Sequence, residues 1–334
     1  MNKKPLIRLT VSFFTLLILI FAKGIFTPIK SMSAQEQIFT VAKGQGAAAI
    51  GRNLTEARLV RGKLFFEIAV VLNRGARKLQ AGRYLITNKM SCWQIAKKII
   101  KGDVARQTIF IPEGWNTKEI SRYLSNLGLA KTTDFNNVVN NDFSSQFAFL
   151  KDKPETASLE GYLFPDTYEI DIGSDTETII RQMLVNFDRK LTPEIRQEIK
   201  NQKKTIFEIV TMASLLEKEA KTLEDKKLIS GIFWKRLNTG MVLQSCATVV
   251  YALGRNPGQL SYEDLKIDSP YNTYKYSGLP PGPICNPGMD SIIAAIYPKT
   301  SQYWYFLSPP DGTIYYSQTL EEHNIKKAKY LQSY

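Results

Sequence analysis

The stretch EIVTMASLLEKEAK, residues 208–221, restricts the fold most, because it carries the closely spaced Glu217 and Glu219 into an otherwise apolar helical pattern. The apolar residues recur with the helical period and predict an amphipathic helix with one buried stripe. They are Ile206, Ile209, Ala213, Leu216 and Ala220. Lys218 then points away from that stripe, and Glu217 and Glu219 lie on its two opposite flanks. Helical geometry leaves the two glutamates equivalent, so the wall of a cleft can receive either carboxylate.

Length and charge narrow the architecture and the partners. A chain of 334 residues with 44% apolar content exceeds what one compact domain usually holds, so we expect at least two domains with appendages. The net charge of +13 is balanced by an anionic polymer, an anionic lipid surface or nucleic acid. The basic residues are scattered and form no zinc-finger, helix-turn-helix or RNA-binding signature, so we expect no nucleic-acid partner.

The N-terminus predicts export. Lys3, Lys4 and Arg8 precede an uncharged apolar run at residues 9–22, which is the layout of a secretory signal or a signal anchor. The run is short for a span of about 20 residues, although Lys23 can extend its charge toward the outer interface.

Cleavage of this segment is an open alternative. The SMSA sequence at residues 31–34 is only a weak cleavage site. We therefore expect residues 1–30 to form a cytoplasmic tip and an uncleaved single-pass transmembrane helix. The rest of the chain would lie on the exterior side of the cytoplasmic membrane.

Cysteine and histidine chemistry is not indicated. The chain has three cysteines, which are Cys92, Cys246 and Cys285. Because this number is odd and no CxxC spacing occurs, neither a disulfide framework nor a metal site is expected. His323 is the only histidine, and no GxSxG nucleophile motif accompanies it. We expect no cofactor, and a carboxylate is the most economical acid or base.

The first exported part predicts a small α+β module. A strand at 38–42, a glycine turn leading into a helix within 44–60, a second helix at 63–72, a strand at 80–87 and a helix at 91–100 follow one another. Ser91 is a suitable N-cap for the last helix. Such a module has too little core to be the whole protein, so a binding or docking role suits it.

The larger remainder is mostly helical. A strand at 108–112 opens it, and residues 131–157 resemble a helix-rich connector. Periodic apolar residues predict the remaining helices, which lie at 176–191, 206–220, 227–237, 289–296 and 320–330. Segments 303–308 and 313–317 are expected to form a closing hairpin around the PDG turn at 310–312.

Residues 269–288, SPYNTYKYSGLPPGPICNPG, are rich in proline, glycine, asparagine and tyrosine and cannot form a regular helix or central strand. A loop of this length inside a compact domain is more often functional than idle. Its tyrosines and asparagine suit the gripping of sugar rings, whereas the alternative is a purely structural Ω-loop.

Several ordered motifs resemble the MltG/YceG family of membrane-anchored endolytic murein transglycosylases. They are IPEG at 111–114, LEGYLFPDTY at 159–168, MASLLEKEA at 212–220, SPYNTY at 269–274, GLPPGPICNPG at 278–288 and SQTLEEHN at 317–324. The resemblance implies a LysM-like subdomain at 36–104 and an α+β YceG-like catalytic domain at 107–334.

The resemblance also implies a chemistry. Lytic transglycosylases cleave the β-1,4 bond between N-acetylmuramic acid and N-acetylglucosamine without water, and leave 1,6-anhydro ends. One glutamate acts as acid and then as base, unlike the carboxylate pair of ordinary glycosidases. Its pKa must be raised by partial burial. Peptidoglycan is the implied partner, and penicillin-binding or other wall-synthesis and division proteins are candidate protein partners.

The resemblance assigns the catalytic role to Glu219, with Glu217 as the alternative. The expected walls of the cleft are Glu160, Tyr162, Gln244, Tyr271, Asn272 and Tyr274. Cys246 and Ala247 stand where the family usually has Asp-Pro, and Cys285 stands where alanine is common, so rate and specificity are expected to differ. The rival hypothesis is a non-catalytic peptidoglycan-binding scaffold.

Overall fold

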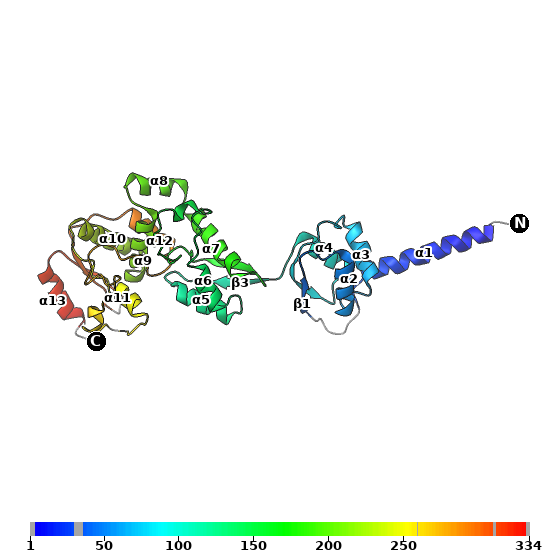
Figure 1. Cartoon of the computed structure of the whole chain (residues 1–334), viewed down its shortest axis with the longest axis horizontal. Helices are drawn as coiled ribbons and strands as arrows, with labels where there is room; N and C mark the ends of the chain where they lie inside the picture. Colours follow the sequence, from blue (N-terminus) through cyan, green and yellow to red (C-terminus); the bar gives the residue numbers. More distant parts are fainter. Residues whose placement is uncertain (1–3, 30–35, 259, 310–311, 332–334) are drawn as a thin grey trace. The chain divides into compact units, whose positions relative to one another are not determined.

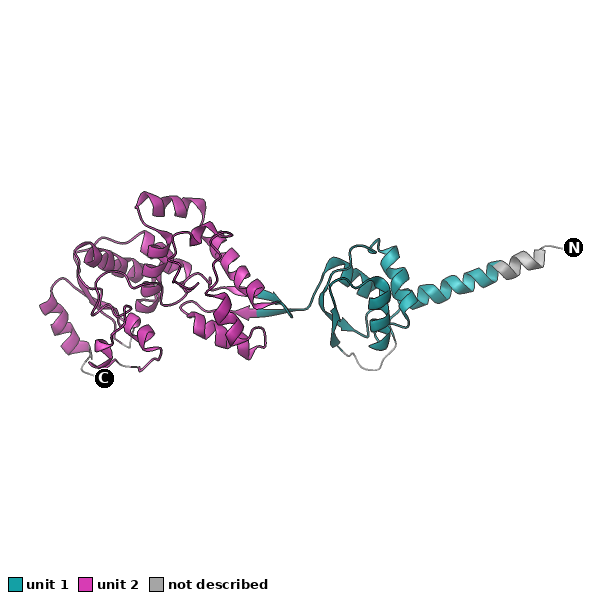
Figure 2. Cartoon of the chain, in the orientation of Figure 1, with its two compact units in different colours: residues 1–108, 169–174 teal, residues 109–168, 175–334 magenta. Residues whose placement is uncertain are grey.

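The computed structural model describes residues 4–29, 36–258, 260–309 and 312–331, with side chains from 11 to 330. The weak cleavage site at residues 31–34 and Lys3 lie outside the described residues. The chain forms two compact units (Figure 2). The first comprises residues 1–108 and 169–174, and the second comprises residues 109–168 and 175–334.

The first unit has the expected mixture of helices and strands. Strands β1 (Glu36–Val41) and β2 (Gly82–Thr87) pair antiparallel, with Ile38 opposite Leu85. The helices of this unit are α1 (Lys4–Phe26), α2 (Ala47–Glu56), α3 (Lys63–Leu72) and α4 (Cys92–Lys101). The order β1-α2-α3-β2-α4 matches the predicted module, whereas its LysM-like character stays a prediction.

Every second side chain of β1 and β2 points into the core of this unit. Phe39 and Val41 face inward beside Tyr84 and Ile86, and all four are buried. Helix α4 starts at Ser91, whose hydroxyl accepts a hydrogen bond from the backbone N–H of Gln94 in a capping box. The predicted N-cap is therefore confirmed.

Helix α1 is joined to the first unit at its C-terminal end. Ile25 is buried there, and the Phe21 ring lies 5.7 Å from that of Phe65. The Arg61 guanidinium donates hydrogen bonds to the carbonyls of Lys23 and Thr27. In the part of the chain that is described, no helix is long and apolar enough to cross a membrane, which differs from the expected spanning helix.

Strands β3 (Arg106–Phe110) and β4 (Thr167–Asp171) form a separate two-stranded sheet. The segment 169–174 belongs to the first unit, although we expected it in the larger domain. The backbone accounts for this difference, because the N–H of Ile172 donates to the carbonyl of Ala105 at 2.8 Å.

The second unit is mainly helical around α9 (Ile206–Glu219), as Figure 1 shows. The other helices are α5 (Thr117–Asn126), α6 (Thr132–Val138), α7 (Thr176–Lys190), α8 (Pro193–Asn201), α10 (Leu223–Asn238), α11 (Cys246–Leu253), α12 (Met289–Ile296) and α13 (Leu320–Leu331). Two 3₁₀ turns lie between these elements: η1 (Ala148–Leu150) follows α6, and η2 (Asp264–Lys266) follows α11. Strands β5 (Tyr305–Leu307) and β6 (Tyr315–Ser317) form the predicted hairpin, whose turn includes residues outside the described part.

Helix α9 is more deeply buried than its apolar period predicted. Val210, Met212 and Leu215 are fully buried, and so are the polar Thr211 and Ser214. The expected single buried stripe is therefore wrong for most of the helix, because α10, α11 and α12 pack against several of its sides. Charged residues occur only in its first turn, at Glu208, and in its last turn.

Candidate active site

The C-terminal end of α9 presents Glu219. The helix begins at Thr205 in a capping box with Glu208, and it ends where Ala220 turns to an extended conformation. A carboxylate oxygen of Glu219 accepts a hydrogen bond from the hydroxyl of Ser245, which directly precedes α11. The position is thus fixed from two sides, by the helix and by the segment before α11.

The surroundings of Glu219 favour its protonated form. The residue keeps some exposed surface, but protein atoms crowd its carboxyl group, and this desolvation raises the pKa. The Ser245 hydroxyl and the positive charge of Arg236 lower the pKa, but they do not outweigh burial. A partly exposed glutamate with a raised pKa can deliver a proton to a bound substrate.

The Arg236 guanidinium, whose charge acts on Glu219, is held in a fixed position by backbone carbonyls. Arg236 in α10 is buried, and its guanidinium donates to the carbonyl of Leu243 at 2.6 Å and to that of Trp304 at 2.7 and 2.9 Å. These carbonyls fix the side chain, so its charge acts on Glu219 from a constant position.

Glu217 has a different environment two residues earlier. Its carboxylate lies 3.2 Å from the Lys226 ammonium, and the two side chains are 9% and 3% exposed. The backbone N–H of Gly288 and the hydroxyl of Ser291 also donate to it, at 3.0 and 2.5 Å. Glu217 therefore joins α9, α10 and the start of α12, and its geometry is that of a structural carboxylate.

Ser245 is positioned by a small buried network. Its backbone N–H donates to the Thr273 hydroxyl at 3.0 Å, and the Thr248 hydroxyl donates to its carbonyl at 2.8 Å. Gln244, just before it, is exposed and adopts a left-handed conformation with φ of 55°. The sequence analysis missed Ser245 and Thr273, although Ser245 directly follows the predicted Gln244 and Thr273 lies inside the quoted SPYNTY stretch.

Tyr271 and Tyr274 both contact α11, Tyr274 at its first residue and Tyr271 near its C-terminal end. The Tyr274 hydroxyl is 3.0 Å from the sulfur of Cys246, and Cys246 is exposed. The Tyr271 ring is half-buried, with its centroid 4.9 Å from that of Tyr251. Gln244, Tyr271 and Tyr274 thus keep accessible surface and are compatible with a cleft wall.

Asn272 has a structural role instead. It is fully buried, and its side-chain amide donates to the carbonyls of Leu265 and Ile267 at 2.8 and 2.9 Å. Its side-chain oxygen accepts from the backbone N–H of Tyr274 at 3.0 Å. The prediction that Asn272 lines the cleft therefore needs correction, because its polar groups are used inside the loop.

Glu160 and Tyr162 also lie inside the second unit. Glu160 accepts hydrogen bonds from the backbone N–H of Thr117 and the amide of Asn286, each at 3.1 Å, and burial raises its pKa to about 7. Tyr162 is fully buried, with its ring 5.8 Å from that of Phe149. Neither offers a surface to a glycan, because this aromatic stretch forms core.

No group of three or more histidine, cysteine, aspartate or glutamate side chains is placed to hold a metal ion within the described ranges. The arrangement at the end of α9 is thus that of a single accessible glutamate beside a hydroxyl and a fixed cation. It suits proton transfer by one carboxyl group.

Known proteins resemble the chain over most of its length. It is 33% identical to an endolytic murein transglycosylase of Bacillus subtilis, over 94% of this chain and 90% of that protein. It is 32% identical to one of Streptococcus pneumoniae, over 97% of this chain and 65% of that protein. The crystal structure of a YceG-like protein from Listeria monocytogenes matches 88% of this chain and all of that one, with a TM-score of 0.59 and 36% identity. A model of the YceG-like family matches residues 39–329, and the chain belongs to this family.

Proposed function

We propose that the chain is an endolytic peptidoglycan lytic transglycosylase, and that Glu219 is its acid and base. One observation carries the assignment: the carboxyl group of Glu219 is crowded enough to have a raised pKa, yet part of the residue is exposed. The names of the curated relatives support the same reaction.

The proposed reaction needs one carboxyl group. Protonated Glu219 gives its proton to the glycosidic oxygen, and the bond from that oxygen to C1 of N-acetylmuramic acid breaks. The resulting carboxylate then removes the proton from the 6-hydroxyl of the same sugar. The freed oxygen bonds to C1 and closes a 1,6-anhydro ring, so Glu219 is protonated again and no water is consumed.

The remaining groups have supporting roles. The Ser245 hydroxyl and the Arg236 charge stabilise the carboxylate that forms after the first proton transfer. Gln244, Tyr271 and Tyr274 supply flat faces and hydrogen-bonding edges for the sugars. Glu217 takes no part in proton transfer, because Lys226, Gly288 and Ser291 already occupy its carboxylate.

Attachment to the cytoplasmic membrane through the N-terminal segment belongs to the same proposal. The basic residues before the apolar run support it, and the packing of Ile25 against the first unit supports retention of the segment. Removal of α1 would expose part of that unit's core and leave the Arg61 guanidinium without its carbonyl partners. The exterior location, the termination of nascent strands and contacts with wall-synthesis proteins are further parts of the proposal.

The deciding experiment is the digestion of uncrosslinked glycan strands by the full-length chain, with mass spectrometry of the ends. We expect 1,6-anhydro ends from the parent and from Glu224→Gln, a matched exposed glutamate. We expect a loss on the order of a thousandfold for Glu219→Gln, as is usual for removal of an acid-base group.

Other products would contradict the proposal. Ends that carry an added water would indicate a hydrolase. Retained strand binding without cleavage by the parent would favour the scaffold, the second candidate function.

A further inference from the structure

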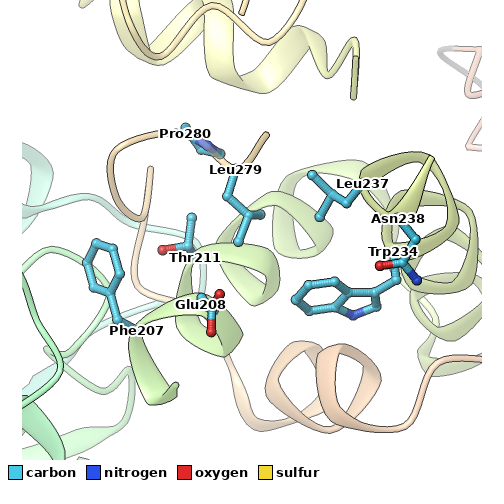
Figure 3. Close-up of a pocket in the computed structure, with 8 residues that line it drawn as sticks. All are labelled: Phe207, Glu208, Thr211, Trp234, Leu237, Asn238, Leu279 and Pro280. Atoms are coloured by element: carbon cyan, nitrogen blue, oxygen red, sulfur yellow. The ribbon is translucent and has the colours of Figure 1, made fainter. Parts of the chain in front are cut away.

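A cavity lies near the start of α9, and Glu219 is not among its lining residues. Its volume is about 360 Å³. Figure 3 shows Phe207 and Trp234 on opposite sides of it, with Leu279 and Pro280 along one edge and the Glu208 carboxylate along another. This size is within the range of pockets that hold small organic groups.

The two aromatic rings are held in place. The indole N–H of Trp234 donates to the carbonyl of Ala295 at 2.9 Å, and the Lys204 ammonium lies 3.7 Å from the centre of the ring. The Phe207 ring lies beside Gly282, 3.6 Å from the position that a Cβ there would take. Fixed aromatic faces suit the apolar C–H faces of a pyranose ring.

Polar groups complete the wall of the cavity. One carboxylate oxygen of Glu208 accepts from the backbone N–H of Thr205 at 2.7 Å, while the other accepts no hydrogen bond among the described residues. Asn238 adds an exposed amide. A carboxylate accepts hydrogen bonds from hydroxyl and acetamido N–H groups.

The cavity shares a helix face with Glu219. Glu208, which also lines the cavity, precedes Glu219 by eleven residues, or about three helical turns, so both lie on one face about 16 Å apart along the axis. The proline-rich loop follows the same helix: Ile284 donates to the Ser214 hydroxyl at 3.0 Å, and Gly288 donates to Glu217 at 3.0 Å.

We propose that this cavity is a remote sugar subsite that holds one N-acetylated pyranose ring of the glycan strand, a few units from the bond beside Glu219. The inference rests on the proposed function, because it assumes that the substrate is a glycan strand. The subsite would let the enzyme select strands long enough to reach from Glu219 to the cavity.

Binding tests the subsite without cleavage. The full-length chain carrying Glu219→Gln is titrated with N-acetylglucosamine dimer and hexamer. We expect Leu237→Trp, which fills the cavity from a half-buried position, to weaken hexamer binding at least about tenfold and dimer binding much less. Leu279→Trp, placed on the loop side, should give the same result. Val185→Trp, at an exposed position on α7, is the control and should bind as the parent does.

A spectroscopic readout locates the sugar. The indole N–H signal of Trp234, assigned from its loss in Trp234→Phe, should shift with the hexamer. Unchanged hexamer affinity in both cavity-filling variants would overturn the subsite. Binding of free stem peptides at Trp234, with no effect of the peptide-free hexamer, would overturn it in favour of a peptide site.

Failure of the proposed function has a separate signature. If the parent yields no anhydro ends but the cavity-filling variants still weaken hexamer binding, the subsite stands as a sugar site and the transglycosylase assignment falls. If the parent yields anhydro ends and hexamer binding is insensitive to these variants, only the subsite falls.

Discussion

Glu217 and Glu219, in the last turn of α9, have different hydrogen-bond and ion-pair partners, although helical geometry alone did not distinguish them. Glu217 has a buried lysine, a backbone N–H and a hydroxyl around one carboxylate oxygen. Glu219 accepts a hydrogen bond from the Ser245 hydroxyl, and the Arg236 guanidinium acts on it only as a charge outside ion-pair distance. In the described residues Glu219 forms no ion pair, so its proton is available for transfer.

This difference distinguishes a carboxylate that stabilises the fold from one that is free to transfer a proton. A glutamate that neutralises a buried cation cannot give up or take a proton without leaving a charge unpaired. A glutamate that is crowded but lacks a paired cation is the one whose pKa rises. The partners of each side chain, rather than its position on the helix, decide its role.

The largest effect on stability is expected for Glu217→Gln. This change leaves Lys226 charged at a site where only 3% of its side chain is exposed, and breaking such a pair costs about 3–5 kcal/mol. Urea denaturation should show this loss, whereas the exposed Glu224→Gln should stay within about 0.5 kcal/mol of the parent. Unchanged stability of Glu217→Gln would remove the structural role from the comparison.

Glu160 sharpens the comparison, because it is buried and pairs with no cation among the described residues. Its folded pKa is about 7, against an ordinary value of 4.5. The folded state therefore binds a proton more tightly than the unfolded state, and stability falls as pH rises from about 4.5 to about 7. The full effect is about 3 kcal/mol.

The measurement is urea denaturation at a series of pH values. Glu160→Gln should lack this part of the pH dependence, since an amide does not titrate in the range. Equal slopes for the parent and Glu160→Gln would show that other groups govern stability between pH 5 and 7.

A smaller effect is expected from Ser245→Ala. The Ser245 hydroxyl stabilises the Glu219 carboxylate and so lowers the pKa of Glu219. Its removal should raise that pKa, and the alkaline limb of the kcat profile should move to higher pH, because Glu219 must be protonated for the first step. Ser230→Ala, a buried serine of α10, is the control and should leave the limb in place. A shift in the opposite direction would mean that Glu219 is not the titrating acid.

Local patterns predicted the elements of the fold well. The period of α9 and the cap at Ser91 are both read from residues close in sequence, because each involves side chains only a few positions apart. Helix α8 escaped notice, although Thr192 caps it and Pro193 stands in its first turn.

The roles of the acidic residues depended on distant partners. Ser291 is 74 residues from Glu217, and Ser245 is 26 residues from Glu219, so no local pattern reports these hydrogen bonds. Tyr162 was misplaced for a related reason. An aromatic residue beside proline and glycine has the same local sequence whether it faces a sugar or, as here, Phe149 and Phe187.

The smallest effect is expected from Cys246→Asp, which places an acidic residue where the resemblance to the family implies one. Cys246 is exposed, so the change should alter stability by no more than about 0.5 kcal/mol. A carboxylate there would lie near Glu219 and disfavour its ionised form, so the pKa of Glu219 should rise and the alkaline limb of kcat should move to higher pH. Cys246→Asn, which adds similar volume without charge, should leave the limb unchanged. If both variants behave alike, the volume rather than the charge of residue 246 acts on Glu219, and the electrostatic contrast between the two glutamates does not extend to residue 246.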